Sequence, residues 1–136
     1  MGVNHVAVYG TLRLNQGNWS WALAHKPHVG THRLDGFELY SGPGFPYAAK
    51  KEGSQITVDL FGEIDAETLQ RLDGLEGHWS AGDPRNHYDR GVVKVDGVEA
   101  FIYFVDREEV KHSCLITSGD WLNREETFSM RGFSLG

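Results

Sequence analysis

The chain has 136 residues and a formal net charge of −6, with 40% hydrophobic and 12% aromatic residues. This composition is ample for one hydrophobic core, so extensive disorder is excluded and we expect residues 1–136 to form a single domain. The negative charge argues against a general nucleic-acid-binding protein, and no apolar run is long enough to cross a membrane. We therefore expect neither nucleic-acid nor membrane partners.

The single cysteine, Cys114, cannot form an internal disulfide, and the N-terminus lacks the basic-then-apolar layout of a secretion signal. Both features are typical of a protein that works in a reducing compartment, so we expect a cytoplasmic localisation. The oligomeric state stays open at this level.

The first half of the chain predicts strands separated by turns. Residues 3–9 predict a buried strand, and residues 21–25 predict a short helical stretch. Residues 29–40 predict two strands joined by a turn at their Asp-Gly pair. Residues 42–46, with two glycines and two prolines, predict an irregular loop.

The second half predicts one further strand, a helix and a hairpin. Residues 56–64 alternate in part as a strand, and residues 66–76 predict a helix with Asp65 as N-cap and Gly77 as the C-terminal stop. Residues 92–105 predict a hairpin, because their Asp-Gly pair favours a type I′ turn. The remaining tail has only weak signals of order. The mixture predicts a mainly β, α+β domain, or a closed barrel with a few helices.

The helix over residues 66–76 carries a carboxylate where a leucine is the ordinary choice. Leu69, Leu72 and Glu76 are spaced at i, i+3 and i+7, so they share one face. Desolvation and the negative end of the helix dipole both disfavour a charged group there, and both raise its pKa toward neutral pH. Glu76 is therefore a candidate for proton transfer, and the alternative is a solvated glutamate at a frayed helix end.

The motif Tyr9-Gly10-Thr11-Leu12 follows the first predicted strand. A glycine there lets the backbone turn so that successive N–H groups point outward, which forms a nest for a carboxylate or a phosphate. A glycine that ends a strand is also a common simple turn, so both interpretations remain open.

Three histidines, His25, His28 and His32, suggest a metal site at first sight. Pro27 and Gly30 break the helix that would bring them together, and no cysteine or carboxylate cluster completes a ligand shell. The chain also lacks a phosphate-loop or dinucleotide-binding fingerprint. We therefore expect no metal site and no nucleotide site of these two kinds.

Short motifs occur in one order along nearly the whole chain, namely VAVYGTLR (6–13), GFELY (36–40) with FPY (45–47), GEID (62–65), LDGLEG (72–77), YDR (88–90) and SGDW (118–121). Together they resemble the γ-glutamyl cyclotransferase-like family, which includes the γ-glutamylamine cyclotransferases and the plant AIG2-like proteins. The last motif is similar to a tail motif of small bacterial members. The resemblance implies a compact, mainly antiparallel β-barrel with a few flanking helices, and catalysis without a cofactor.

The resemblance also implies a reaction. The α-amine of a γ-glutamyl group would attack its own γ-carbonyl, which releases 5-oxoproline and an amine or amino acid. Glu76 would act as general base and then as general acid, and Tyr88 would contact the substrate or orient Glu76. The substrate-binding residues would be Tyr9, Gly10, Thr11, Leu12, Pro46 and Tyr88.

One departure from compact relatives is the loop over residues 77–87, which we interpret as longer than theirs and able to reshape the cavity mouth. It leaves the identity of the substrate open. Two other functions remain as alternatives: a non-catalytic module that binds a small carboxylate in the same cavity, and a protein-interaction domain whose contact surface is the loop around Trp79. A buried, unpaired carboxylate is costly for a pure binding module, so Glu76 favours the enzyme.

Overall fold

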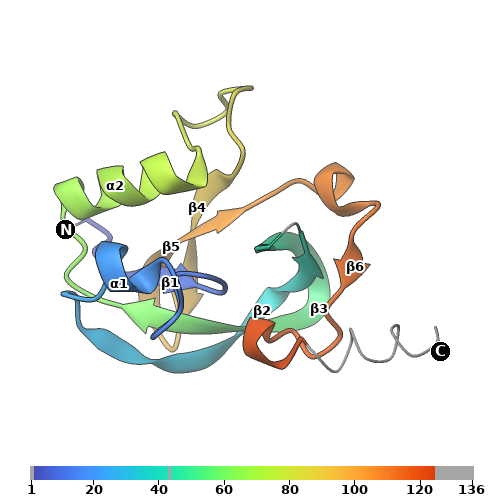
Figure 1. The fold of residues 1–136 in the computed structure, drawn as a ribbon, viewed down its shortest axis with the longest axis horizontal. Helices are drawn as coiled ribbons and strands as arrows, with labels where there is room; N and C mark the ends of the chain where they lie inside the picture. The colour runs from blue at the N-terminus through green and yellow to red at the C-terminus, as the bar shows by residue number, and fades with distance from the viewer. Residues whose placement is uncertain (1, 43, 125–136) are drawn as a thin grey trace.

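The computed structural model describes residues 2–42 and 44–124 (Figure 1). One six-stranded sheet forms the body, with strand order β4-β5-β1-β3-β2-β6. All of its strand pairs are antiparallel except β1 with β5. The strands are β1 (Val6–Val8), β2 (His28–Ser41), β3 (Pro46–Phe61), β4 (Asp89–Val95), β5 (Val98–Phe104) and β6 (Cys114–Leu115).

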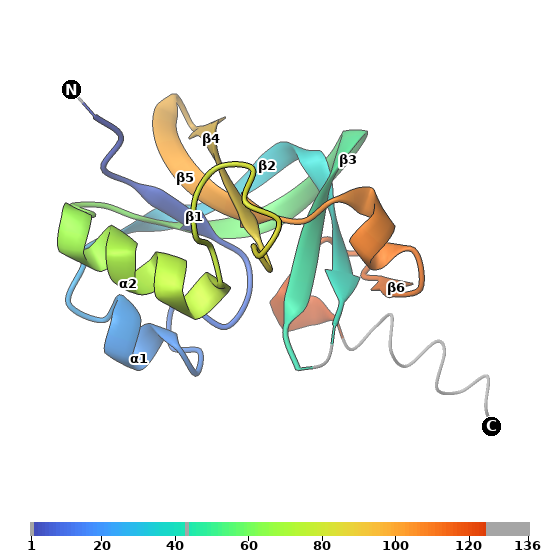
Figure 2. The ribbon, with the colours of Figure 1, turned by 90° about the horizontal axis from the view of Figure 1, so that it is seen from above.

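The sheet curves into a half-barrel, and β4 and β6 are its edge strands (Figure 2). The expected α+β class with a mainly antiparallel, barrel-like sheet is confirmed. The predicted hairpin is also confirmed as β4 and β5, because both residues of its turn, Asp96 and Gly97, have positive φ angles of 51° and 80°.

The longest strands differ from the prediction. The expected turn inside residues 29–40 is a bulge in one continuous strand, β2, with Gly36 at φ 95° and a register shift between Asp35 and Phe37. A glycine with positive φ serves a bulge as readily as a turn, and pairing with β3 keeps the chain extended. The strand predicted over residues 56–64 runs instead from Pro46 to Phe61, because residues 46–50 also pair with β2, opposite its residues 37–41.

Two helices lie side by side on one side of the sheet, α1 (Trp19–Ala22) and α2 (Ala66–Glu76). The predicted boundaries of α2 are confirmed: the Asp65 side chain accepts a hydrogen bond from Thr68 N at 2.9 Å, and Gly77 ends the helix at φ 67°. The first helix begins earlier than predicted and is a single turn. Two short 3₁₀ helices follow at residues 107–110 and 121–123. No helix in residues 2–42 and 44–124 is long and apolar enough to cross a membrane.

The central strand β1 is buried on both faces, although it is shorter than the predicted 3–9. Val6 and Val8 pack into the core beneath the helices, where they meet Leu72 of α2, whereas Ala7 and Tyr9 belong to the core on the other face. This alternation is the period-2 pattern of a strand between two layers. It places the end of β1 beside the end of α2.

Candidate active site

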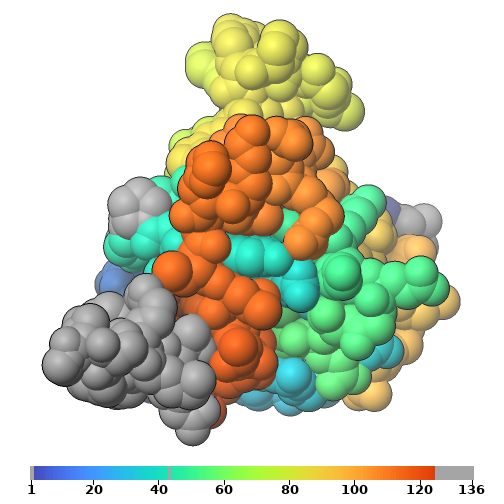
Figure 3. All heavy atoms as spheres, turned by 90° about the vertical axis from the view of Figure 1, so that its right-hand side faces the viewer, coloured from blue at the N-terminus to red at the C-terminus, as the bar shows by residue number. Residues whose placement is uncertain are grey.

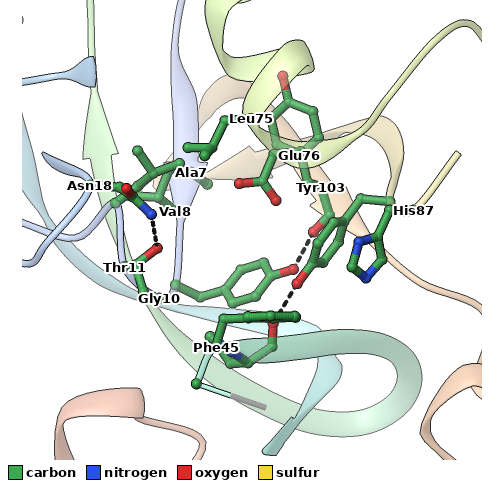
Figure 4. A pocket seen from close by; sticks show the side chains of 15 residues that line it. Ala7, Val8, Gly10, Thr11, Asn18, Phe45, Leu75, Glu76, His87 and Tyr103 are labelled. Carbon is green, nitrogen blue, oxygen red and sulfur yellow. Dashed lines mark hydrogen bonds between the residues drawn. The ribbon is translucent and has the colours of Figure 1, made fainter. Parts of the chain in front are cut away.

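A cavity of about 270 Å³ lies where the end of β1, the last turn of α2 and the start of β3 meet (Figure 4). All seven residues assigned to the site from the sequence line this one cavity, although their segments are far apart along the chain. They are Tyr9, Gly10, Thr11, Leu12, Pro46, Glu76 and Tyr88.

Glu76 is the last residue of α2, and its carboxylate points into the cavity (Figure 4). Within residues 2–42 and 44–124 its carboxylate forms no hydrogen bond and no ion pair. Burial raises the pKa of Glu76 from 4.5 to about 7, because a charged carboxylate without donors is disfavoured away from water. At neutral pH this group is therefore able both to accept and to return a proton.

The tyrosine hydroxyls around this carboxylate donate their protons elsewhere. Tyr9 donates to the backbone oxygen of Tyr103 at 2.6 Å, and Tyr88 donates to that of Pro46 at 2.8 Å. Tyr103 donates to Oδ1 of Asp73 at 2.6 Å. Three potential donors are thus held in other bonds, which explains why burial of the carboxylate is not offset by hydrogen bonds.

Tyr88 lines the cavity, and the sequence left open whether it contacts the substrate or orients Glu76. Burial raises the pKa of its hydroxyl, and the negative charge of Glu76 raises it further, so the phenol stays protonated. Its proton is committed to Pro46 O, so Tyr88 does not orient Glu76 by donating to it. Its oxygen keeps acceptor capacity, and contact with a substrate stays a prediction.

The loop after β1 forms a turn in which the amide N–H of Arg13 donates to Gly10 O at 2.9 Å. None of the hydrogen bonds formed in the described part of the chain uses the amide N–H of Gly10, Thr11 or Leu12. These amides belong to residues that line the cavity, as an anion-binding nest requires.

Gly10 is required here for a reason other than the expected freedom to turn. It lies outside the left-handed region, but a Cβ built on it would lie 2.6 Å and 2.7 Å from two ring carbons of Pro46. The glycine therefore permits the close approach of the loop to the start of β3.

Eight residues of the cavity lining were not assigned from the sequence: Ala7, Val8, Asn18, Gly44, Phe45, Leu75, His87 and Tyr103. Asn18 donates to Oγ1 of Thr11 at 2.8 Å. Tyr103 lies on β5, and no local signal distinguished it from an ordinary core aromatic. His87 ends the loop over residues 77–87 and stacks on the Tyr88 ring with centroids 4.9 Å apart.

Sequence comparison identifies the family. The model of the family described as "Gamma-glutamyl cyclotransferase, AIG2-like" matches residues 6–123. The chain belongs to this family. The residues matched by the family model, 6–123, include both the loop after β1 and Glu76.

Several relatives share the cyclotransferase fold and sequence. The chain is 32% identical over 121 residues to a gamma-glutamylcyclotransferase family protein from Escherichia coli K12, covering 89% of this chain and 98% of that one. It is 32% identical over 88 residues to the gamma-L-glutamyl-butirosin B gamma-glutamyl cyclotransferase of Niallia circulans, covering 61% and 52%. The crystal structure of an uncharacterized protein from Pyrococcus horikoshii superposes with a TM-score of 0.70 at 27% identity, covering 96% and 98%.

The loop over residues 77–87 of this cyclotransferase-family chain stands out from the body (yellow in Figure 3). Its own contacts order it: Asn86 accepts from Trp79 N at 2.6 Å, and Arg85 stacks over the Trp79 ring while it pairs with Asp83 at 2.8 Å. The Trp79 side chain is left 60% exposed. Only the end of the loop, at His87, reaches the cavity.

The three histidines considered for metal binding do not form a ligand cluster with acidic residues or Cys114. In residues 2–42 and 44–124 no three His, Cys, Asp or Glu side chains are arranged to hold a metal ion. His28 instead contacts Oδ1 of Asp59 at 3.3 Å.

Proposed function

We propose that this chain is a γ-glutamyl(amine) cyclotransferase, which cyclises a γ-glutamyl group to 5-oxoproline and releases an amine or amino acid. One observation carries the proposal: the unpartnered, partly buried carboxylate of Glu76 shares a cavity with three backbone amides that donate to no group of the described chain. Membership of the family supports it, and so does the likeness to the Niallia circulans enzyme.

The substrate would bind with its α-carboxylate on the amides of the loop after β1. A carboxylate accepts from such N–H groups with charge-assisted hydrogen bonds, which are about twice as strong as neutral ones. Anchoring that end folds the γ-glutamyl chain back on itself, so that the α-amine lies near its own γ-carbonyl. Ring closure is intramolecular, and proximity therefore supplies much of the acceleration.

Glu76 would then move the protons. The α-amine is mostly an ammonium ion at neutral pH, so the carboxylate of Glu76 first takes one proton from it. The amine nitrogen attacks the γ-carbonyl carbon, and the bond between that carbon and the departing nitrogen breaks as Glu76 returns the proton to the departing nitrogen. The attacking nitrogen then gives up a second proton, which Glu76 passes to the released amine in the same way. The ring nitrogen has lost two protons and the amine, released as an ammonium ion, has gained two, so no other reactant is consumed.

The first test is the product. When the protein is incubated with a panel of γ-glutamyl amines and γ-glutamyl dipeptides, we expect 5-oxoproline and the free amine in equal amounts, at a rate unaffected by EDTA. Every proposed step is a proton transfer by a side chain or an attack within the substrate. Free glutamate as the main product, or activity lost on chelation and restored by a divalent ion, would indicate metal-assisted hydrolysis instead.

The second test is the pH dependence. We expect kcat/KM to rise with pH through an apparent pKa near 7, because this profile reports the free enzyme, in which Glu76 must be ionised to accept a proton and burial raises its pKa to about 7. The profile of kcat/KM also contains the titration of the substrate's own α-ammonium, which is measured separately on the free substrate. A kcat/KM that is flat from about pH 5 to 9 would contradict the assignment of Glu76 as the base.

A further inference from the structure

Arg13 is a buried cation that directly follows the amide-bearing loop. Its side chain is only 5% exposed within the fold, and it contacts two carboxylates: Nε lies 3.1 Å from Oδ2 of Asp59, and Nη1 lies 2.7 Å from Oδ1 of Asp120. Its own amide closes the turn onto Gly10 O. The residue that shapes the turn is therefore also the residue that ties it to the rest of the fold.

Asp59 holds the first of these contacts within the sheet. It lies on β3 and accepts from Leu14 N at 3.0 Å and from Oγ1 of Thr31 at 2.6 Å. Burial alone would raise the pKa of Asp59, but the hydrogen bonds from Thr31 and Leu14 and the Arg13 guanidinium outweigh it and lower the pKa. An ionised carboxylate is thus fixed in β3 against both Arg13 and the residue after it.

Asp120 belongs to the SGDW motif, which the proposed chemistry does not use. This segment is fixed to β3 as well, because Gly119 O accepts from Thr57 N at 2.7 Å. Gly119 has a φ of 69°, and a Cβ on it would overlap the backbone oxygen of Gln55. Side-chain changes at this glycine are therefore obstructed, and Asp120 is held in place beside Arg13.

We propose that Arg13, Asp59 and Asp120 form a brace that positions the amides of Gly10–Leu12, so that the motif at residues 118–121 controls substrate binding from outside the cavity. This inference rests on the proposed function, in which those amides bind the α-carboxylate. The amides of Gly10, Thr11 and Leu12 donate to no group of the described chain, so they do not themselves hold the turn in place. Holding it in the binding geometry before the ligand arrives reduces the ordering cost of binding.

Positioning and electrostatic attraction make opposite predictions here. One guanidinium between two carboxylates leaves the brace with a net charge of −1, so it does not attract an anionic substrate. If the charges acted only through their field, removal of the Asp120 carboxylate would improve binding of the substrate. If the brace acts by position, the same change weakens binding.

The test is Asp120→Ala, with Asp120→Asn as the conservative variant and Asp35→Ala as the matched control. Asp35 lies on the same sheet and accepts from Gln55 at 2.5 Å, away from the loop. We expect KM to rise about tenfold in Asp120→Ala and less in Asp120→Asn, because asparagine still offers an acceptor to Arg13. We expect kcat to stay within about twofold, with its pH midpoint unchanged, and Asp35→Ala to match the wild type.

A second readout does not depend on activity. Amide hydrogen exchange at Arg13 and Leu14, whose N–H groups donate to Gly10 O and to Asp59 in the ligand-free protein, should be faster in Asp120→Ala than in Asp35→Ala, and Asp120→Asn serves if the alanine variant does not fold. Unchanged exchange with unchanged or lower KM would overturn the brace, as would a shift in the pH midpoint of kcat. If the wild type released no 5-oxoproline, the proposed function would fail while the exchange measurement still decided whether the brace exists.

Discussion

Glu76→Gln is expected to abolish turnover while the protein stays folded. Glutamine has almost the same shape as glutamate, and the carboxylate forms no hydrogen bond or ion pair within the described residues that the change would break. An amide cannot take a proton from the α-ammonium, so the loss of general acid–base catalysis should cost about 10²–10⁴-fold in kcat. Release of 5-oxoproline measures the activity, and thermal unfolding measures the fold.

The same substitution should stabilise the protein above neutral pH. The pKa of Glu76 is raised from 4.5 to about 7 in the fold, so between these values the native state keeps a proton that the unfolded chain has lost. Wild-type stability therefore falls as pH rises through this window, by at most about 3 kcal/mol at ~1.4 kcal/mol for each tenfold change in proton affinity. The glutamine variant has no titrating group at this position, so its stability does not fall over this pH range for this reason.

The matched control is Glu67→Gln, which changes an exposed carboxylate in the first turn of the same helix. It should leave both the turnover and the pH dependence of the thermal midpoint near those of the wild type. If Glu76→Gln folded and kept wild-type activity, Glu76 would not be the base, and the cavity would have to work through another group.

Gly10→Val should be the second severe change, with a loss of at least about 100-fold in kcat/KM. The first added carbon already meets the Pro46 ring at 2.6 Å, and the further methyl groups of valine would push the loop away from the start of β3. Thr11→Ser is the control beside it, because serine keeps the hydroxyl that accepts from Asn18. We expect its kcat and KM to stay within about twofold of the wild-type values.

Steady-state kinetics separate these two variants, and circular dichroism checks that each is folded. If the Gly10→Val protein folded and kept the wild-type KM, the loop after β1 would not be part of the substrate-binding site. A severe effect of Thr11→Ser would instead assign the ligand contact to the hydroxyl rather than to the backbone.

The local features of the site could be predicted from the sequence. The helix α2 was predicted with its boundaries because apolar spacing, the N-cap Asp65 and the stop at Gly77 all act within a few residues. The same spacing placed Glu76 on the buried face. The turn of the β4–β5 hairpin was equally local, since Asp96-Gly97 by itself favours the two positive φ angles that it adopts.

The long strands could not be predicted in the same way. Whether the glycine at position 36 makes a turn or a bulge depends on a partner strand, and β3 begins as early as Pro46 because residues 46–50 pair with β2. The cavity residues that the sequence did not indicate were missed for the same reason, because their position depends on contacts between distant segments. Tyr103 becomes a cavity residue only because β5 lies beside β1, and the bond between Tyr9 and Tyr103 joins residues 94 positions apart.

The sequence by itself therefore determined the family, the helix that carries Glu76 and the loop that faces it, because each is written in short, ordered motifs. The tertiary structure alone decided that the hydroxyls of Tyr9, Tyr88 and Tyr103 donate away from that carboxylate, and that Arg13 joins two acids from distant segments. The physical reason is that burial and the sharing of donors are properties of packing. The pKa of Glu76 depends on which donors its neighbours have already committed, and no local pattern records this.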